Sequence, residues 1–259
     1  MAEALIDKVA AAVREAADMA HGRWRGEFAQ WEKAPGNPVC EIDLAANDIL
    51  RRRLGEIDPD AGWLSEENAD HPDRLLGPRV WVVDPIDGTR DYIRGRPGWS
   101  VSVALVEGGQ PILGVLDAPA RGEHWRAEAG KGAWRNGVRL KSSQRMEFSG
   151  ARVPTDALPR IDGDLQMVEK PNSIALRIAM IAADEADLVA TIRWGHEWDI
   201  AAAVLIAREA GAVVTDALGG ALRFNSTKGR AFGVIAAAPG IHDAAVARLR
   251  DRAEAGIQR

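Results

Sequence analysis

The sequence predicts an α/β protein whose N-terminal half is of the α+β type. In the middle of the chain, short apolar runs alternate with turn signals such as Gly108-Gly109 and Asn136-Gly137, which is typical of antiparallel hairpins. In the second half, helical and strand patterns follow one another, which indicates α/β organisation. The 259 residues, 46% hydrophobic and 27% charged, suffice for one large domain or two modest ones.

Two amphipathic helices are expected near the N-terminus. Residues 2–20 place apolar side chains at helical spacing, and Gly22 lies just past the expected end. A second helix is expected over residues 44–54, with Asp43 as its N-cap and Gly55 at its end.

The remaining elements follow from the apolar runs and their periods. Strands are predicted over residues 80–83, 101–105, 112–116, 123–129, 132–140, 212–215 and 232–237. Helices are predicted over residues 173–183, 199–210 and 242–254. Because residues 141–149 are polar and follow no period, we place a boundary there, between an α+β domain of residues 1–143 and an α/β domain of residues 144–259.

Charge and cysteine content exclude several classes of protein. The formal net charge is −5 and no long run of Lys or Arg occurs, whereas binding to nucleic-acid polymers or anionic membranes needs a basic surface. No window of about 18 uncharged apolar residues predicts a transmembrane helix, and the N-terminus lacks the apolar core of a signal peptide. With Cys40 as the single cysteine, no intrachain disulfide can form, so we expect a cytoplasmic protein.

The most informative stretch is residues 81–89, Trp-Val-Val-Asp-Pro-Ile-Asp-Gly-Thr. A buried strand ends at Asp84, and because Pro85 cannot donate a hydrogen bond, we expect the chain to leave the sheet there. Asp87 follows closely enough for both carboxylates to reach shared cations, with the Ile86 carbonyl between them. Carboxylate and carbonyl oxygens are the ligands that Mg²⁺ prefers, so the string predicts a magnesium site.

The two residues after Asp87 are suited to binding an anion. Gly88 lets backbone N–H groups approach a phosphate closely, and Thr89 supplies a hydroxyl beside it. Asp, Pro and Gly are also common in surface turns, but a turn does not explain the whole string directly after a buried strand. A phosphate next to the magnesium site is the favoured interpretation.

Two further acidic elements are candidates for the same centre. Glu66 and Glu67 follow Trp63-Leu64, and one of them could bridge to the metals, although a Glu-Glu pair alone is more typical of a solvated loop. Asp199 opens the helix expected over residues 199–210. Its carboxylate is either an N-cap or a ligand that projects from the positive end of the helix into a cleft, and the sequence leaves both open.

Together these motifs resemble the inositol monophosphatase family of metal-dependent, lithium-sensitive phosphatases. The matching strings, in the order that the family has them, are Ser65-Glu66-Glu67, Asp84-Pro85-Ile86-Asp87-Gly88-Thr89 and Trp198-Asp199-Ile200-Ala201-Ala202. The resemblance implies a layered αβαβα sandwich and hydrolysis of a small phosphomonoester by a metal-activated water. Cys40 stands where many relatives have Thr, and Asp91 where inositol-specific members often have Asn.

The resemblance also implies roles for individual residues. Two or three Mg²⁺ ions would be held by Glu66, Asp84, the Ile86 carbonyl, Asp87 and Asp199. Asp84 would bridge two ions, and the catalytic residues would be Glu66 with Thr89 and Asp43, of which the last two orient the nucleophilic water. The lysine of the preceding loop corresponds to Lys33. Relatives are commonly dimers, and nothing in the chain contradicts a homodimer.

The choice of phosphate ester depends on residues 193–199, Arg-Trp-Gly-His-Glu-Trp-Asp. This string is closer to the Arg-Phe-Gly and Glu-Trp-Asp pattern of 3'(2'),5'-bisphosphate nucleotidases than to inositol-specific relatives, which tend to have Glu in place of Arg193. An arginine suits a second phosphate because its planar fork binds one bidentately; the alternative is a solvated surface residue. Arg177 is expected nearby, and His196 is expected to line the cleft rather than to bind metal.

The substrate-binding residues are therefore expected to be Gly88, Thr89, Arg177, Arg193 and His196. We place 3'(2'),5'-bisphosphate nucleotidase first, inositol-1-monophosphatase second and histidinol-phosphate phosphatase third. A non-catalytic regulatory protein on the same scaffold is the rival from another class, and the presence of all four carboxylates and Thr89 disfavours it.

Overall fold

The structure is a computed structural model that describes residues 4–257. Its helices are α1 (Leu5–Arg23), α2 (Glu41–Ile57), α3 (Thr89–Ile93), α4 (Ile174–Ala182), α5 (Ala201–Glu209) and α6 (His242–Ile257). Its strands are β1 (Gln30–Ala34), β2 (Asn37–Cys40), β3 (Gly62–Ser65), β4 (Arg79–Asp87), β5 (Ser100–Glu107), β6 (Gln110–Ala118), β7 (Glu123–Glu128), β8 (Gly132–Arg135), β9 (Val138–Arg139), β10 (Arg152–Pro154), β11 (Gln166–Val168), β12 (Leu188–His196), β13 (Val213–Thr215) and β14 (Arg230–Ala237).

Seven strands form the larger sheet, in the order β3-β4-β5-β6-β7-β8-β9. β3 pairs in parallel with β4, and the other neighbours are antiparallel, as predicted for the middle of the chain. Side chains of β4 alternate between two cores: Trp81 and Val83 pack with α1 and α2, whereas Val80 and Val82 pack with α4 and α5. Because both faces are buried, the strands read as nearly continuous apolar runs.

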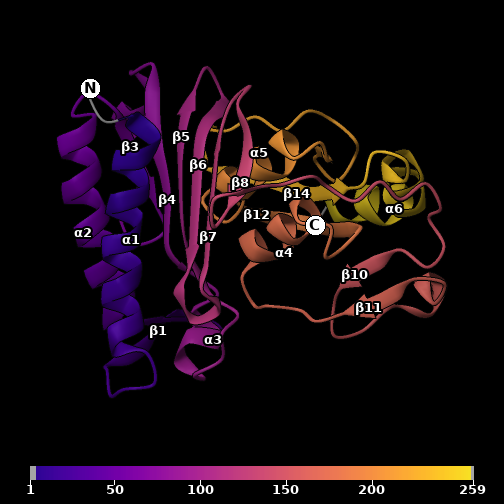
Figure 1. Cartoon of the computed structure of the whole chain (residues 1–259), viewed down its shortest axis with the longest axis horizontal. Coiled ribbons are helices and arrows are strands. Elements are labelled where there is room, and N and C mark those ends of the chain that lie inside the picture. The colour runs from indigo at the N-terminus through magenta and orange to yellow at the C-terminus, as the bar shows by residue number, and fades with distance from the viewer. Residues whose placement is uncertain (1–3, 258–259) are drawn as a thin grey trace.

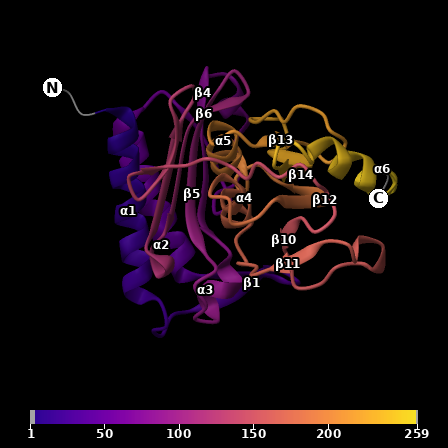
Figure 2. The same cartoon turned by 45° about the vertical axis from the view of Figure 1, so that its right-hand side comes forward.

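Helices α4 and α5 lie between the larger sheet and a second sheet, of three strands ordered β12-β14-β13. α5 approaches β6 so closely that a Cβ on Gly114 would lie 2.8 Å from the Ala202 carbonyl oxygen, which only glycine avoids. α6 covers the outer face of the smaller sheet, where Leu188, Ile235 and Val246 share a core. The layers run helices, sheet, helices, sheet, helix (Figures 1 and 2), so the predicted αβαβα sandwich is confirmed.

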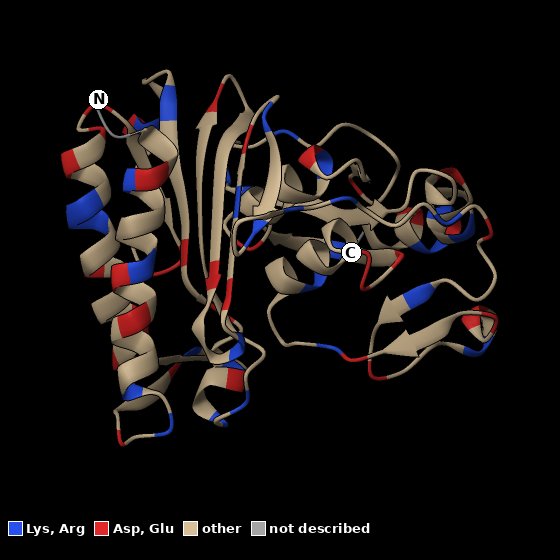
Figure 3. Ribbon diagram, in the orientation of Figure 1, with Lys and Arg blue, Asp and Glu red and all other residues tan. Residues whose placement is uncertain are grey.

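Charged residues are spread over the outside of these layers. Along α1 and α2, acidic and basic residues are interspersed rather than gathered into one basic surface (Figure 3). Some pair across the two helices, as Arg52 and Arg53 do with Glu15. Among residues 4–257, no helix combines the length and apolar character needed to cross a membrane.

Both N-terminal helices extend past the glycines predicted to end them. α1 begins at Leu5 and continues through Gly22 to Arg23, and positions 2 and 3 of the predicted helix lie outside the described residues. α2 continues through Gly55 to Ile57. A glycine inside a helix costs only about 1 kcal/mol, which the packing of the surrounding turns offsets.

The start of α2 also differs from the prediction. The helix begins at Glu41, and its N-cap is Cys40, not Asp43. Asp43 lies at the third helical position and accepts a hydrogen bond from the Cys40 N–H, which makes a capping box. Asp43 therefore belongs to the first turn of α2, and its second carboxylate oxygen can contact the site described below.

The sequence does not predict several of the strands. The hairpin of β1 and β2 lies at the surface, and all five residues of β1 are exposed, so no apolar alternation marks it. β12 contains a register shift between Thr191 and Trp194, which interrupts its period. β3 has only four residues, and β10 and β11 pair in parallel over three residues each. Elements this short, or this exposed, leave little periodic signal.

The predicted boundary coincides with a segment that has no helix or strand over residues 141–149. The largest core nevertheless takes residues from both sides of it, from Leu64 to Ala236. The division into residues 1–143 and 144–259 stays a prediction, and the two parts share one core.

Candidate active site

β4 carries three of the predicted ligands through a bulge. Asp84 is paired with Ser102 of β5 and Asp87 with Ser100, so the spacing on β4 is one residue longer than on β5. Pro85 lies inside this bulge, where its missing N–H costs no ladder hydrogen bond. The expectation that the chain leaves the sheet at Pro85 is therefore wrong, because β4 continues to Asp87.

Gly88 turns the chain from β4 into α3. Its φ is 95°, in the left-handed region, and an added Cβ would lie 2.7 Å from the Gly98 carbonyl oxygen and 2.9 Å from the Ser173 nitrogen. Both the conformation and the close approach require glycine. The main chain at this turn lines the cavity without a side chain in the way.

Thr89 belongs to a chain of hydrogen bonds that leads away from the cavity. Its hydroxyl lies 3.0 Å from Asp43 Oδ1 and 3.0 Å from the Ile86 carbonyl oxygen, and it can donate to either. Asp43 Oδ2 accepts from both the backbone N–H and the thiol of Cys40, each at 2.8 Å. Burial raises the pKa of Asp43, and these hydrogen bonds oppose the rise. Asp43 is thus held in one orientation behind Thr89.

Asp87 is tied to the start of α4. Its Oδ2 accepts hydrogen bonds from the Ser173 hydroxyl at 2.5 Å and from the Ala175 N–H at 2.7 Å. Ser173 is also the N-cap of α4 and accepts from the Leu176 N–H. Burial raises the pKa of Asp87 to about 6, although these donors favour the charged form.

Glu66 enters the site from the end of β3 and contacts a lysine from the surface hairpin. Lys33 Nζ donates to Glu66 Oε1 at 2.9 Å and to Glu67 Oε1 at 2.7 Å. Burial lowers the pKa of Lys33, but the two glutamates outweigh it and raise the pKa above its usual value. The ammonium therefore lies where it neutralises a predicted metal ligand.

Asp199 lies just before α5 and does not cap it. α5 begins at Ala201 with Ile200 as N-cap, and Asp199 Oδ2 instead accepts from the His196 N–H at 3.4 Å. Of the two roles that the sequence leaves open, only a carboxylate directed into the cleft agrees with this geometry. The His196 ring stacks on Trp198 with centroids 4.2 Å apart, and burial lowers the pKa of His196, which disfavours the charged form of the ring.

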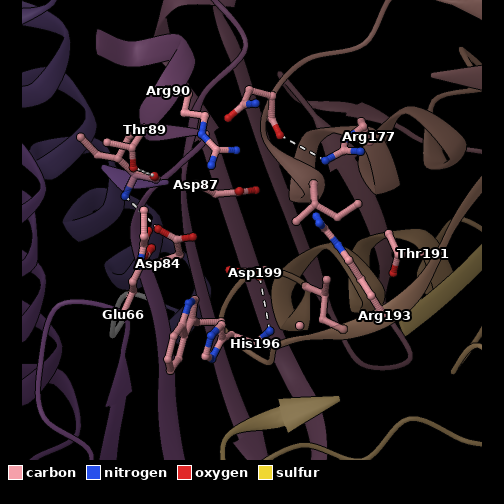
Figure 4. Close-up of a pocket in the computed structure, with 18 of the residues that line it drawn as sticks. Glu66, Asp84, Asp87, Thr89, Arg90, Arg177, Thr191, Arg193, His196 and Asp199 are labelled. Atoms are coloured by element: carbon pink, nitrogen blue, oxygen red, sulfur yellow. Dashed lines mark hydrogen bonds between the residues drawn. The ribbon is translucent and has the colours of Figure 1, made fainter. Parts of the chain in front are cut away.

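The structure gathers the predicted residues around one cavity of about 680 Å³ (Figure 4). All of them except Asp43 line it, namely Lys33, Glu66, Asp84, Ile86, Asp87, Gly88, Thr89, Arg177, Arg193, His196 and Asp199. They come from both halves of the chain, since Arg177 belongs to α4 and Arg193 and His196 to β12. The cavity is therefore complete only when the two sheets and the helices between them are assembled.

The carboxylates gathered on one wall of the cavity carry more negative charge than the cations on that wall neutralise. Burial, added to repulsion from neighbouring carboxylates, raises the pKa values of Asp84 and Asp199 well above their usual range. As they lie here, no group of three or more His, Cys, Asp or Glu side chains in the described part of the chain is arranged to hold a metal ion. Lys33 holds Glu66, and the start of α4 holds Asp87. The donor set fits Mg²⁺ in its chemistry, because it offers only oxygens and excess negative charge.

Cations line the opposite side of the cavity. Arg193 extends from β12 toward Asp87 and Arg177 (Figure 4). Arg177 is partly buried, and its guanidinium donates only to main-chain carbonyls, those of Asn172 at 3.2 Å and Ser173 at 3.3 Å. Within residues 4–257 no carboxylate lies within ion-pair distance of it. Burial and the nearby Arg193 lower the pKa of Arg177, whereas attraction to Asp87, Asp156 and Asp199 opposes the fall. The cation therefore has carboxylates in its surroundings but forms no direct ion pair with them.

Sequence reasoning missed three residues of the site. Arg90 and Lys170 line the cavity, and Arg90 follows directly after the predicted string. Ser173 shows a recognisable signal as the N-cap of a predicted helix, but its contact with Asp87 spans 86 positions. Such a contact depends on how α4 packs against β4, which no local pattern specifies.

Comparison with known proteins finds a family model, curated relatives and solved structures that agree with one another. The model described as "Inositol monophosphatase family" matches residues 1–255. The "Fructose-1,6-bisphosphatase/inositol-1-monophosphatase" of Thermotoga maritima is 34% identical over 186 residues, which cover 69% of this chain and 71% of that protein. The "3'(2'),5'-bisphosphate nucleotidase CysQ" of Escherichia coli K12 is 33% identical over 197 residues, covering 71% and 78%. The solved structure of a Thermotoga maritima IMPase has a TM-score of 0.82 at 30% identity and covers 96% of this chain and 98% of that one.

Proposed function

The chain belongs to the inositol monophosphatase family of metal-dependent phosphomonoesterases, and from this premise we propose that its substrate carries two phosphates, as a 3'(2'),5'-bisphosphate nucleotide does. The single observation that carries the proposal is the partly buried guanidinium of Arg177, which forms no direct ion pair, with Arg193 beside it on the wall opposite the carboxylates. A buried charge without a partner is costly, so a ligand that supplies the anion gains most from this site.

Magnesium would be held by the predicted ligands, Glu66, Asp84, the Ile86 carbonyl, Asp87 and Asp199. Bound Mg²⁺ supplies charge neutralisation for the phosphoryl oxygens and lowers the pKa of a nearby water. The raised pKa values of Asp84 and Asp199 support this assignment, because a cation would relieve the repulsion that raises them. Whether two or three ions are bound is part of the proposal.

The remaining steps belong to the side chains themselves. Thr89 accepts the hydrogen of a water with its hydroxyl oxygen while it donates its own proton to Asp43, which stays fixed by Cys40. This pair orients the attacking oxygen toward the phosphorus. The turn at Gly88 brings main-chain N–H groups to the reacting phosphate, and Arg193 and Arg177 bind the second phosphate.

The arginines distinguish this proposal from the alternatives. Inositol 1-phosphate and histidinol phosphate carry one phosphate each, so either substrate would leave Arg177 and Arg193 without a second phosphate to bind. The names of the two relatives do not decide between the candidates, since one is called a bisphosphate nucleotidase and the other both a fructose-1,6-bisphosphatase and an inositol-1-monophosphatase. Inositol-1-monophosphatase remains the second candidate and histidinol-phosphate phosphatase the third.

A turnover panel tests the assignment. Phosphate release is measured with Mg²⁺ from 3'-phosphoadenosine 5'-phosphate, inositol 1-phosphate and histidinol phosphate, with a chelator and with Asp87→Asn as negative controls. We expect the highest kcat/KM with the bisphosphate, and no turnover in either control. Preference for inositol 1-phosphate would remove the role of the arginines, and absence of metal-dependent turnover of all three would favour a non-catalytic scaffold. Gel filtration with light scattering tests the proposed homodimer.

A further inference from the structure

A second cavity, of about 220 Å³, lies on the other side of β12 from the active site. β12 lies between the two spaces: Thr191 and Arg193 line the active-site cavity, whereas residues 188–190 and Ile192 line the second one. β10, the loop after it and α6 enclose the rest of the second cavity, on the side that Figure 2 brings forward. Nothing in the proposed reaction uses this space.

The lining of the second cavity is mostly apolar. Its side chains include Phe148, Val153, Leu158, Leu188, Ile192 and Leu249. An engineered cavity of about 150 Å³ with a similar lining binds benzene, so the larger cavity here has room for one aromatic ring with a short substituent.

Most of the charged residues at this cavity already neutralise one another. Arg252 forms two hydrogen bonds with Asp162, of 2.7 and 3.0 Å. Arg248 is paired with Asp164 at 3.0 and 3.2 Å. The exception is Arg177, which lines both cavities and forms no direct ion pair in residues 4–257, although Asp87, Asp156 and Asp199 attract it from farther away.

These observations specify the charge of a ligand. One unpaired cation at the wall of an apolar cavity is complementary to one anionic group on an apolar body. A phosphate would place two charges beside a single guanidinium in an apolar space, whereas a carboxylate places one. The ring-sized volume and the single charge together select an aromatic carboxylate.

We propose that this cavity is a regulatory site for a small aromatic carboxylate, which binds Arg177 from the side opposite the substrate. The guanidinium then serves either the regulator or the second phosphate. Binding of the carboxylate weakens binding of a bisphosphate and leaves a monophosphate unaffected. The effect on substrate rests on the proposed function, but occupation of the cavity does not.

Calorimetric titration of the full chain with phenylacetate tests occupation of the cavity. Phenylethanol, which keeps the ring without the charge, and acetate, which keeps the charge without the ring, are the control ligands. We expect both controls to bind about 10- to 100-fold more weakly, since each lacks one of the two interactions. Equal binding of phenylethanol, or no binding of phenylacetate, would overturn the site.

Variants locate the binding. Ala190→Leu adds bulk to the half-buried wall of the second cavity and leaves the active-site lining intact, so we expect it to abolish phenylacetate binding. Ala255→Leu makes the same change at an exposed position of α6 and should bind normally. Circular dichroism verifies that both variants fold. Unchanged affinity of folded Ala190→Leu would place the ligand elsewhere and refute the proposal.

The regulatory effect is measured separately from binding. With phenylacetate present, we expect the KM for 3'-phosphoadenosine 5'-phosphate to rise and the KM for adenosine 3'-phosphate to stay constant. An equal rise for both would mean competition for the reacting phosphate and would refute regulation through Arg177. If the bisphosphate is not turned over at all, the proposed function fails, while calorimetry still decides whether the cavity binds the carboxylate.

Discussion

The Ser173 hydroxyl donates a hydrogen bond of 2.5 Å to the carboxylate of Asp87 and so joins the end of β4 to the first turn of α4. α4 also carries Arg177, one turn further along. The predicted metal ligand and the proposed second-phosphate group are therefore set in register by one hydroxyl. From this contact we predict that Ser173, a residue outside the sequence motifs, matters for the proposed reaction.

Replacing Ser173 should impair both catalysis and metal use. In Ser173→Ala, Asp87 loses one of its donors and α4 loses its N-cap, which costs about 0.5–2 kcal/mol of stability. We expect kcat to fall by about 10-fold or more and the Mg²⁺ concentration for half-maximal rate to change. Ser100→Ala removes the neighbouring hydroxyl, 3.1 Å from Ser173, but keeps both hydrogen bonds to the Asp87 carboxylate, and should leave the Mg²⁺ dependence unchanged. The same change in both variants would assign Ser173 a purely structural role.

Arg193 should affect only substrates with a second phosphate. A charge-assisted hydrogen bond contributes about 1.5–3 kcal/mol, so Arg193→Gln should raise the KM for 3'-phosphoadenosine 5'-phosphate about 10- to 100-fold. The KM for adenosine 3'-phosphate should not move. Arg51→Gln, an exposed residue of α2, is the control for loss of one positive charge. An equal KM increase for both nucleotides would show that Arg193 contacts the reacting phosphate instead.

The hydroxyl of Thr89 should be required for turnover. Thr89→Ala removes the group that links the water to Asp43, and loss of such proton relays typically costs about 10²–10⁴ in rate. Thr89→Ser keeps the hydroxyl and should retain most of the activity. Steady-state kinetics at saturating Mg²⁺ compares the two variants, and equal loss in both would contradict the assignment.

Cys40 should be unreactive in the folded protein. Burial, with the adjacent negative charge of Asp43, raises the pKa of its thiol to about 12. The reactive thiolate is therefore scarce at pH 8, and we expect iodoacetamide to label the chain only after denaturation. Mass spectrometry measures the labelling, with Cys40→Ser as the blank because the chain has one cysteine. Rapid stoichiometric labelling of the native protein would disprove this prediction.

The pair of Arg152 with Asp187 should give a pH-dependent contribution to stability. Burial would raise the pKa of Asp187, but hydrogen bonds from Arg152 and Ser143 prevail and lower it to about 2. A lowered pKa means that the stabilisation is present above the ordinary value near 4 and is lost as pH falls through about 2. Arg152→Met should lower the free energy of unfolding by about 1.5–3 kcal/mol at pH 7.

Urea denaturation at pH 7 and pH 2.5 measures this difference, which should narrow at the lower pH. Arg52→Met removes the exposed pair with Glu15 and should cost only about 0–1 kcal/mol. A deficit in Arg152→Met that is independent of pH would mean that the arginine stabilises through packing alone.

The sequence predicts the carboxylates of the site better than it predicts the hydrogen-bond donors that orient them. Asp84 and Asp87 can be recognised from the local sequence, because a buried apolar strand that ends in acidic residues is typical of a functional site. The donors to Asp87 lie 86 and 88 positions away, so they depend on the packing of α4 against β4. The contact between Asp43 and Thr89 is predicted only by the family resemblance. From the local sequence alone, Asp43 is interpreted as a helix cap.

The strands of the fold also divide into those that the local sequence predicts and those that it does not. The buried strand β4 has an uninterrupted apolar run and is predictable, whereas the exposed β1 and the shifted β12 lack a period. The shared position of Arg177 between two cavities is a consequence of how α4, β10 and α6 meet at the edge of β12. The spacing of residues along the chain does not predict how these elements pack together.

The layered arrangement has a consequence for biosynthesis. A ribosome releases the seven strands of the larger sheet before α4 and α5, so the face that carries Val80 and Val82 has no cover while the rest of the chain is made. That face is apolar and is a natural target for chaperones until α5 arrives. The proposed ligand Asp199 arrives with it, so we expect a chain truncated before residue 199 to be inactive and prone to aggregate.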